Sequence, residues 1–414
     1  MSPNLALLRP ICAAIVLALI PTTVSAQEQG LSLEDALQLA GAESPVASIA
    51  EAEVDIARGN ERQAGYGPNP EVSLEVENIA GSGAFSGLRS NETTLMLTQP
   101  IELGGKRGTR VRAAQAQSSV AELNALISRA DLALAVRQRF TEAVAAKENV
   151  ALQQSIFDRS AELHRIASEL VEAGREPPLR AIRAEAAMAE AETNLRSAEA
   201  EYLNARTNLA ELWGAGTPPE DIETFWLTPD TVAGTRDIAG TLALARASAE
   251  LNAAEADIVR ERRAAIPDLN VGAGIRRFEE TGDTAFTIGA SMAIPLRNRN
   301  QGGIEAAEAN ARATEGRLLL LRMQLQRERT TLLTTISAAE ARVESLSGVI
   351  LPRAEEALEL AQIGYRYGRF TLIDVLDAAS VRDAALADLI SARTDLAQAT
   401  ATLMRLTQRQ GGES

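Results

Sequence analysis

The chain has 414 residues, of which 23% are charged and only 3% aromatic, and its formal net charge is −15. This excess of acidic residues argues against a nucleic-acid partner. The scarcity of aromatic residues and the abundance of alanine favour long, closely packed helices over one compact globular core.

The first 26 residues have the pattern of a cleaved signal peptide. Arg9 precedes an apolar run that is too short to span a membrane, and residues 24–26 (VSA) form a small-residue cleavage site. We expect cleavage near Ala26 and Gln27, which removes Arg9 and changes the net charge from −15 to −16. The single cysteine, Cys12, lies inside this segment, so we expect a mature chain without disulfide or lipid anchor.

The rest of the sequence contains two copies of one unit, which we place at residues 27–220 and 221–414. NPEVSLEVEN at 69–78 resembles IPDLNVGAGI at 266–275, and other matching segments keep nearly the same offset along the chain. Chance matches would not keep one offset, so a tandem structural repeat is predicted.

Each unit is predicted to contain a helical lead-in, two strands, a very long helix and, after a glycine turn, a second helix. In the first unit we expect these at 32–64, about 70–80 and 91–101, about 105–172, and 177–213. In the second unit we expect them at 238–264, about 267–277 and 285–295, about 302–366, and 371–408.

The predicted strands alternate apolar and polar residues. Val72, Leu74 and Val76 would point to one side of the first strand, with glutamate and serine between them. Runs of about ten residues are long enough to cross a bilayer with the apolar side toward lipid. Four strands cannot close a barrel alone, so several chains must contribute, and three chains would give twelve strands. A soluble hairpin with one wet face is the alternative.

Proline and glycine mark the passage from strand to helix in both units. The segment TQPIELGGKRG resembles AIPLRNRNQGG, and the residues that would let the chain bend there are Pro100, Gly104, Gly105, Pro295, Gly302 and Gly303. The flanking basic residues Lys106, Arg107, Arg297 and Arg299 would put positive charge at the inner lipid surface.

The predicted helices carry apolar residues at coiled-coil spacing. Leu195, Ala198, Tyr202, Ala205 and Leu209 are separated by alternating steps of three and four residues. A helix from 105 to 172 would be roughly 100 Å long, which suits a tube across a periplasm better than a small globular domain.

The duplicated unit and the segment YRYGRFTLIDVLDA at 365–378 resemble the TolC-type outer-membrane efflux channels. The GGKRG and RNRNQGG junctions are most similar to the branch that serves heavy-metal export by cobalt–zinc–cadmium or copper–silver pumps of the RND type. The resemblance covers essentially all of the chain after the signal peptide. It implies a mainly α protein with transmembrane β-structure, which forms a homotrimer with a 12-stranded barrel and a long α-helical barrel.

The resemblance also implies partners and a role. A periplasmic adaptor protein would dock on the tunnel tip, an inner-membrane RND-type pump would supply cargo and energy, and outer-membrane lipid would surround the barrel. The channel itself would do no chemistry and need no cofactor. The sequence agrees, because His164 is the only histidine and no metal-ligand spacing is present.

Several residues of the tip match positions with known roles in the family. Asp374 and Asp377 match aspartates that ring the narrowest part of the tunnel, and Tyr365 matches a tyrosine that helps hold the tip shut. The arginine that belongs to the family's closed-state contact would fall at Phe370, and Arg369 is one residue early.

The first unit repeats this turn with reversed charges. When the second unit is shifted back by 194 residues, Gly174 and Arg175 match Gly368 and Arg369, while Arg180 and Arg183 match Asp374 and Asp377. We expect the acidic pair to line the aperture and the basic pair to brace it when closed, within one chain or between neighbours. Alternatively, Arg180 and Arg183 are solvated charges. The two Gly-Arg turns are candidate adaptor-docking points, or ordinary glycine C-caps.

Two other interpretations stay open from the sequence alone. The channel could export drugs or, in type I secretion, proteins. Less favoured is a periplasmic coiled-coil adaptor, which would need neither strands of bilayer length nor an internal duplication.

Overall fold

The computed structural model describes residues 30–229 and 237–410. The expected signal peptide, including Cys12 and the cleavage site at Ala26 and Gln27, lies outside the described residues. Within the described ranges, no helix combines the length and apolar character that crossing a membrane requires. The protein is mostly helical and carries one small antiparallel sheet, as predicted.

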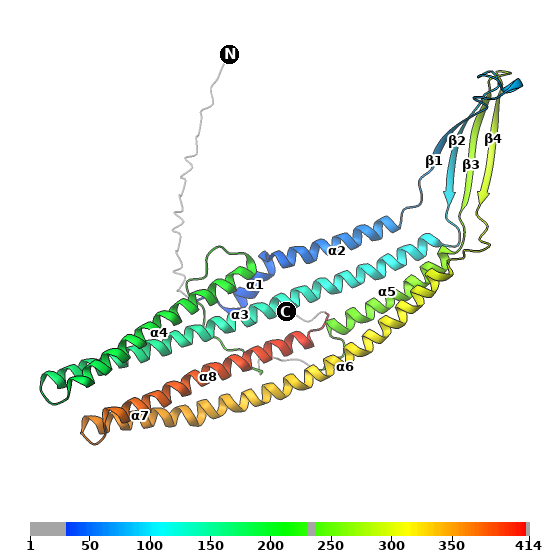
Figure 1. Ribbon diagram of the computed structural model, residues 1–414. Coiled ribbons are helices and arrows are strands. Elements are labelled where there is room, and N and C mark those ends of the chain that lie inside the picture. Colours follow the sequence, from blue (N-terminus) through cyan, green and yellow to red (C-terminus); the bar gives the residue numbers. More distant parts are fainter. Residues whose placement is uncertain (1–29, 230–236, 411–414) are drawn as a thin grey trace, which may run out of the picture.

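The elements follow the same order in the two halves of the chain (Figure 1). The first half contains α1 (Leu33–Glu43), α2 (Pro45–Ala64), β1 (Glu71–Glu77), β2 (Glu92–Ile101), α3 (Lys106–Glu172) and α4 (Pro178–Ala210), with 3₁₀ turns at Gly83–Phe85 and Glu211–Trp213. The second half contains α5 (Leu242–Ala264), β3 (Leu269–Phe278), β4 (Thr284–Met292), α6 (Gln301–Ser345), α7 (Leu351–Arg366) and α8 (Leu372–Thr407).

Two predicted helices are interrupted. The lead-in helix at 32–64 is broken at Ser44, because Pro45 begins a new helix that the Ser44 side chain caps. The long helix expected at 302–366 contains a π turn at Leu346–Ile350 between α6 and α7. Pro352 has no N–H to donate to the preceding turn, and a π turn accommodates such a defect without ending the helix. The chain is thus helical throughout this predicted segment, and the π turn is an irregularity that the sequence analysis did not anticipate.

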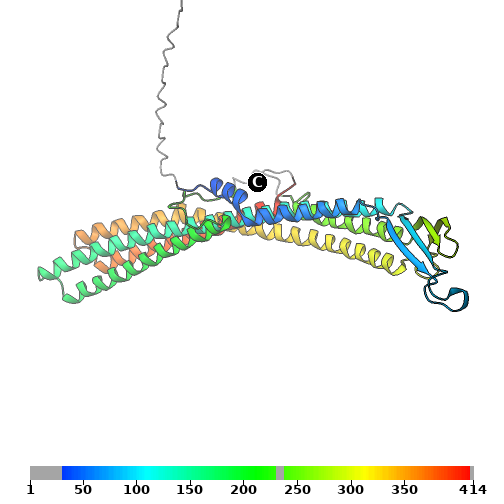
Figure 2. The ribbon, with the colours of Figure 1, turned by 90° about the horizontal axis from the view of Figure 1, so that it is seen from above.

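The helices form one thin, curved layer rather than a closed bundle (Figure 2). Near the sheet the neighbours are α2, α3, α5 and α6, and in the other half they are α4, α3, α8 and α6 with α7. The 67-residue α3 is roughly 100 Å long at ~1.5 Å per residue and runs through both halves. A single layer leaves both outer helices without a neighbour on one side.

The two open edges of this layer carry exposed apolar side chains. On α2 they are Val46, Ile49 and Ile56, and on α6 they are Leu319, Leu320 and Met323. Apolar residues at helical spacing on an unpartnered edge are typical of a surface that another helix covers.

The sheet has the strand order β1-β2-β3-β4, and its register brings the apolar residues of all four strands to one face. Leu74 pairs with Leu95, Leu95 with Ile275, and Ile275 with Phe286. Leu74 is 67% exposed and Phe286 is 86% exposed. The sheet therefore presents a broad apolar surface outward, which confirms the alternation that the sequence predicted.

The opposite face of the sheet is polar. Arg276 donates to Thr94 at 2.9 Å and forms ion pairs with Glu92 at 2.9 Å and Glu77 at 3.3 Å. The edge strands β1 and β4 each have one side without a partner strand. Such edges need pairing in a membrane, because unpaired backbone groups are costly in lipid.

The largest buried cluster lies halfway along the helices. Phe140 and Val136 of α3 pack with Leu209 of α4, Ala36 of α1 and Ile222 of the connecting segment. Tyr202 packs against this cluster, and its hydroxyl donates to Asp221 at 2.7 Å, while Lys147 donates to the same carboxylate at 2.7 Å. These contacts fasten the connection between the two halves to the long helices.

Candidate functional site

Both helical hairpins end in the same kind of turn, at the end of the layer farthest from the sheet (Figure 1). Gly174 and Gly368 both have φ = 69°, in the left-handed region. After each glycine the arginine N–H bonds back five residues: Arg175 to Leu170 at 2.9 Å, and Arg369 to Gly364 at 2.8 Å. Together with the glycine N–H bonds this is the Schellman motif, in which each glycine directly follows the C-cap residue, Ala173 or Tyr367.

Asp374 has a local structural role at the start of α8. Its carboxylate accepts bonds from the backbone N–H and the hydroxyl of Thr371, both at 2.7 Å, and the Thr371 hydroxyl accepts from the Asp374 N–H. This is a capping box. The Thr371 backbone N–H lowers the pKa of Asp374, so this exposed carboxylate is ionised at neutral pH.

Asp377 lies one turn further along α8 and is exposed. Val375 and Ala379 form the buried face of this turn and pack against Leu358 of α7. Asp374 and Asp377 stand away from that face, three residues apart, and therefore on the same side of α8. No ion pair with either aspartate occurs between the residues that the structure describes.

The basic pair lies in a groove beside the start of α8. Arg180 and Arg183 line this groove, and the α8 residues that face it are Leu372, Ile373 and Leu376. Its volume is about 290 Å³. Arg180 forms its ion pair with Glu176, at 3.0 Å. Pairing of the arginines with the aspartates therefore does not occur inside the described chain, and pairing between chains stays a prediction.

The other candidates for holding the tip closed are placed differently. Tyr365 is partly buried and packs against the Leu358–Val375 cluster between α7 and α8. Arg369 is exposed, and Phe370 packs its ring on Gly364, where an added Cβ would lie 2.1 Å from ring carbon Cδ2. The position where the family's arginine was expected is thus part of the packing of the turn.

The sequence analysis missed the contacts that join the two hairpins. Arg159 of α3 pairs with Asp383 of α8, and Arg382 of α8 donates to the Ser155 hydroxyl of α3 at 3.3 Å. Nearer the middle of the layer, Arg405 pairs with Asp131 at 2.5 Å. These partners are more than 200 residues apart, so no local spacing could have indicated them.

The predicted junction residues lie at the other end of the layer. Gly104 and Gly105 have φ of 69° and 73°, and Gly105 is the N-cap of α3. Asn300, with φ = 59°, is the N-cap of α6. Pro100 lies within β2 and Pro295 beyond the end of β4, whereas Gly302 and Gly303 lie inside the first turn of α6.

An ionic network closes the first junction. Arg110 bonds to the two Glu102 carboxylate oxygens at 2.5 and 3.2 Å and to the carbonyls of Ala64 and Tyr66, both at 2.9 Å. The bond from Arg110 outweighs the effect of burial and lowers the pKa of Glu102. This network holds together the end of α2, the end of β2 and the start of α3.

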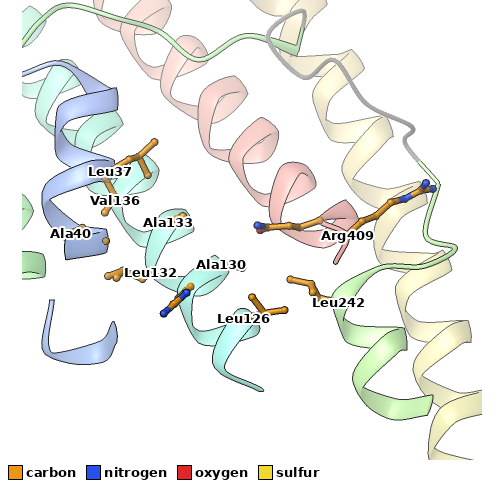
Figure 3. Close-up of a pocket in the computed structure, with 12 residues that line it drawn as sticks. Leu37, Ala40, Leu126, Ala130, Leu132, Ala133, Val136, Leu242 and Arg409 are labelled. Atoms are coloured by element: carbon orange, nitrogen blue, oxygen red, sulfur yellow. The ribbon is translucent and has the colours of Figure 1, made fainter. Parts of the chain in front are cut away.

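A pocket of about 410 Å³ lies near the middle of the layer, between α1, α3 and the start of α5 (Figure 3). Its walls are mostly alanine, leucine and valine, with Arg129, Gln408 and Arg409 at the edge. None of the lining residues supplies a nucleophile or a carboxylate. Within the described ranges, no three His, Cys, Asp or Glu side chains lie close enough to hold a metal ion.

Comparison with known proteins identifies the family. Residues 36–215 and 238–408 match the outer membrane efflux protein family. The chain is 30% identical over 383 residues to the cobalt-zinc-cadmium resistance protein CzcC of Cupriavidus metallidurans, which covers 91% of this chain and 89% of CzcC. It is 27% identical over 331 residues to the nickel-cobalt-cadmium resistance protein NccC of Alcaligenes xylosoxydans xylosoxydans, covering 80% and 76% of the two chains.

Solved structures show the same fold at low identity. A membrane protein from Pseudomonas aeruginosa superposes with a TM-score of 0.79 at 18% identity, covering 92% of each chain. The transmembrane channel protein CusC superposes with a TM-score of 0.76 at 17% identity, covering 91% of this chain and 92% of CusC. The sequence resemblance to TolC-type channels is thereby confirmed, and the chain belongs to the outer membrane efflux protein family.

Proposed function

We propose that this protein is the outer-membrane exit duct of a tripartite efflux system and that its cargo is heavy-metal cations. The observation that carries the proposal is the combination of an outward apolar sheet with helices roughly 100 Å long. One end of such a molecule suits a bilayer, and the other reaches far into an aqueous compartment. Family membership supports the same role.

The open edges of the chain support a homotrimer. Pairing β1 of one copy with β4 of the next would satisfy both strand edges, and three copies would close a sheet of twelve strands. The apolar edges of α2 and α6 would meet across the same boundary. A barrel and a helical tunnel would then share one axis.

The metal cargo is inferred from the relatives and from the tip. CzcC and NccC are named for resistance to cobalt, zinc, cadmium and nickel. In a trimer, Asp374 and Asp377 would form acidic rings at the end of the tunnel, and rings of carboxylates favour cations. The duct is passive in this proposal, without catalysis or cofactor.

The partners would meet the protein at the same tip. A periplasmic adaptor would dock on the turns Gly174-Arg175 and Gly368-Arg369, and an RND-type pump in the inner membrane would supply the cargo. In this proposal the chain is exported with a cleaved signal peptide and carries no lipid anchor.

Single-channel recording in planar bilayers tests the role of the duct. Asp374→Asn with Asp377→Asn should lower the preference for cations over anions, while Glu359→Gln, which removes another exposed carboxylate near the tip, should change it less. Failure of the purified protein to form channels would refute the proposed function. Equal selectivity in all variants would refute the acidic aperture alone.

Growth of a deletion strain tests the cargo. Loss of the gene should reduce tolerance to cobalt, zinc, cadmium or nickel and leave tolerance to organic drugs unchanged. The opposite pattern would favour the alternative of a drug-efflux channel.

A further inference from the structure

The end of the sheet nearest the helices carries an exposed apolar segment that runs from the last residue of β4 toward α6. Met292, Ile294 and Leu296 are 52%, 74% and 78% exposed. Met292 pairs with Leu269 on the outward apolar face. The distance along the chain from Phe286 to Ile294 is about 27 Å at ~3.4 Å per residue, and strand tilt reduces its height to about 20 Å. This is comparable to the apolar band of a membrane barrel.

The charged side chains of the equivalent segment in the first half form ion pairs within the chain. Glu102 binds Arg110 and lies 3.7 Å from Arg107, and Lys106 pairs with Asp268 at 2.8 Å. The Glu102 side chain is only 14% exposed. This junction therefore offers little free charge to a partner.

The second half reverses the charge at this place. Aligning TQPIELGGKRG with AIPLRNRNQGG places Arg297 at the position of Glu102 and Arg299 at that of Gly104. Both arginines are exposed, and no carboxylate of the described chain pairs with either. One guanidinium nitrogen, Nε of Arg299, donates to the Pro295 carbonyl at 3.2 Å. The remaining donors of both side chains point to no acceptor within the described residues.

We propose that Arg297 and Arg299 bind the phosphate of an anionic phospholipid at the helix-side edge of the bilayer, while Ile294 and Leu296 contact its acyl chains. This inference rests on the proposed outer-membrane location. Arginine presents a fork of donors that suits phosphate oxygens. Its long stem can lie along apolar surface while the charged end reaches the headgroups.

The position of the pair favours lipid over a second copy of the chain. The arginines follow directly on the most exposed apolar residues of the segment, which continue the outward face of β4. Apolar side chains with adjacent basic ones are the pattern that binds anionic lipid surfaces. The apolar side of β4 is a face of the sheet and not its hydrogen-bonding edge, so a neighbouring strand paired with β4 would leave this side exposed.

The test uses the purified full-length protein in a neutral detergent, titrated with dioleoylphosphatidylglycerol or dioleoylphosphatidylcholine while thermal unfolding is followed. The anionic lipid should stabilise the wild type at lower concentration than the zwitterionic lipid. Arg297→Gln and Arg299→Gln should each raise the half-maximal concentration of phosphatidylglycerol about 5-fold. Lysine at both positions should restore part of the preference, because it keeps the charge but not the fork of donors. Arg312→Gln, which removes an exposed arginine further along α6, should change nothing.

Two results would overturn the lipid site. One is that phosphatidylglycerol stabilises the wild type and the double variant, Arg297→Gln with Arg299→Gln, at the same half-maximal concentration. The other is loss of the trimer by the double variant in both lipids alike, which would assign the arginines to a contact between copies. Liposome flotation distinguishes these outcomes from failure of the proposed function. A protein that is not a membrane channel would not insert into liposomes and would not float with them, whichever lipid is used.

Discussion

Arg110 is the residue whose loss should most weaken the joint between sheet and helices. Its guanidinium makes four hydrogen bonds to two separate segments, two of them to Glu102 and two to carbonyls at the end of α2. Replacing it with methionine keeps an unbranched apolar stem but removes the guanidinium and with it all four bonds. Glu102, whose side chain is 14% exposed, would be left without its main counter-ion.

The size of the effect follows from burial. Removing one partner of a buried ion pair costs about 3–5 kcal/mol, because the other charge stays buried without compensation. The Arg110 side chain is 35% exposed, so solvent screening reduces this. We expect Arg110→Met to lower the free energy of unfolding by about 3 kcal/mol, which for a chain of this length corresponds to a fall in Tm of about 4 °C.

Thermal unfolding in detergent at pH 7 measures this loss, with Arg112→Met as a control on an exposed arginine of the same helix. Adding Glu102→Gln to Arg110→Met should recover part of the loss, since the uncompensated charge is then gone. Glu102 has a lowered pKa in the folded protein, so its stabilising effect is present above its ordinary value of 4.5 and fades below it. A loss in Arg110→Met that is equal to the control, or unchanged by acidification through pH 4, would refute this reasoning.

Three further predictions concern other parts of the chain. Phe140→Ala should lower the free energy of unfolding by about 3–5 kcal/mol in chemical denaturation, because this ring is 1% exposed at the centre of the main cluster. Arg137→Met should raise the free energy of unfolding by about 1 kcal/mol. Arg137 is 8% exposed and has no counter-ion among the described residues, and burial lowers its pKa. Cation selectivity due to Asp374 should persist down to about pH 4 in reversal-potential measurements, because hydrogen bonds from Thr371 hold its pKa below 3.8, and should be lost on further acidification.

The strands and the tip turns were predictable because their signals are local. Alternation with period two fixes which side chains share a face, and the register places Leu74, Leu95 and Phe286 together. Gly174 and Gly368 were recognisable because only glycine adopts the left-handed conformation at low cost.

Some of what was missed was also visible in the sequence. Thr371 and Asp374 have the spacing of a capping box, and Pro352 marks the π turn. The pairing of Arg159 with Asp383 was not accessible, because it depends on how α3 and α8 pack. Such contacts form only when helices from distant parts of the sequence pack together. The spacing of residues along the sequence does not indicate which helices do so.

The reversed charges gain a physical meaning once three chains are placed around one axis. A position shared by both halves would then recur six times in a ring, and six like charges would repel one another. Glu102 against Arg297, and Arg180 against Asp374, would instead give rings of alternating sign at the two ends of the helices. Inside one chain Arg180 binds Glu176, and the aspartates stand outside its groove. An alternating ring at the tip would therefore be a property of the assembled trimer, formed between chains and absent from the single protomer.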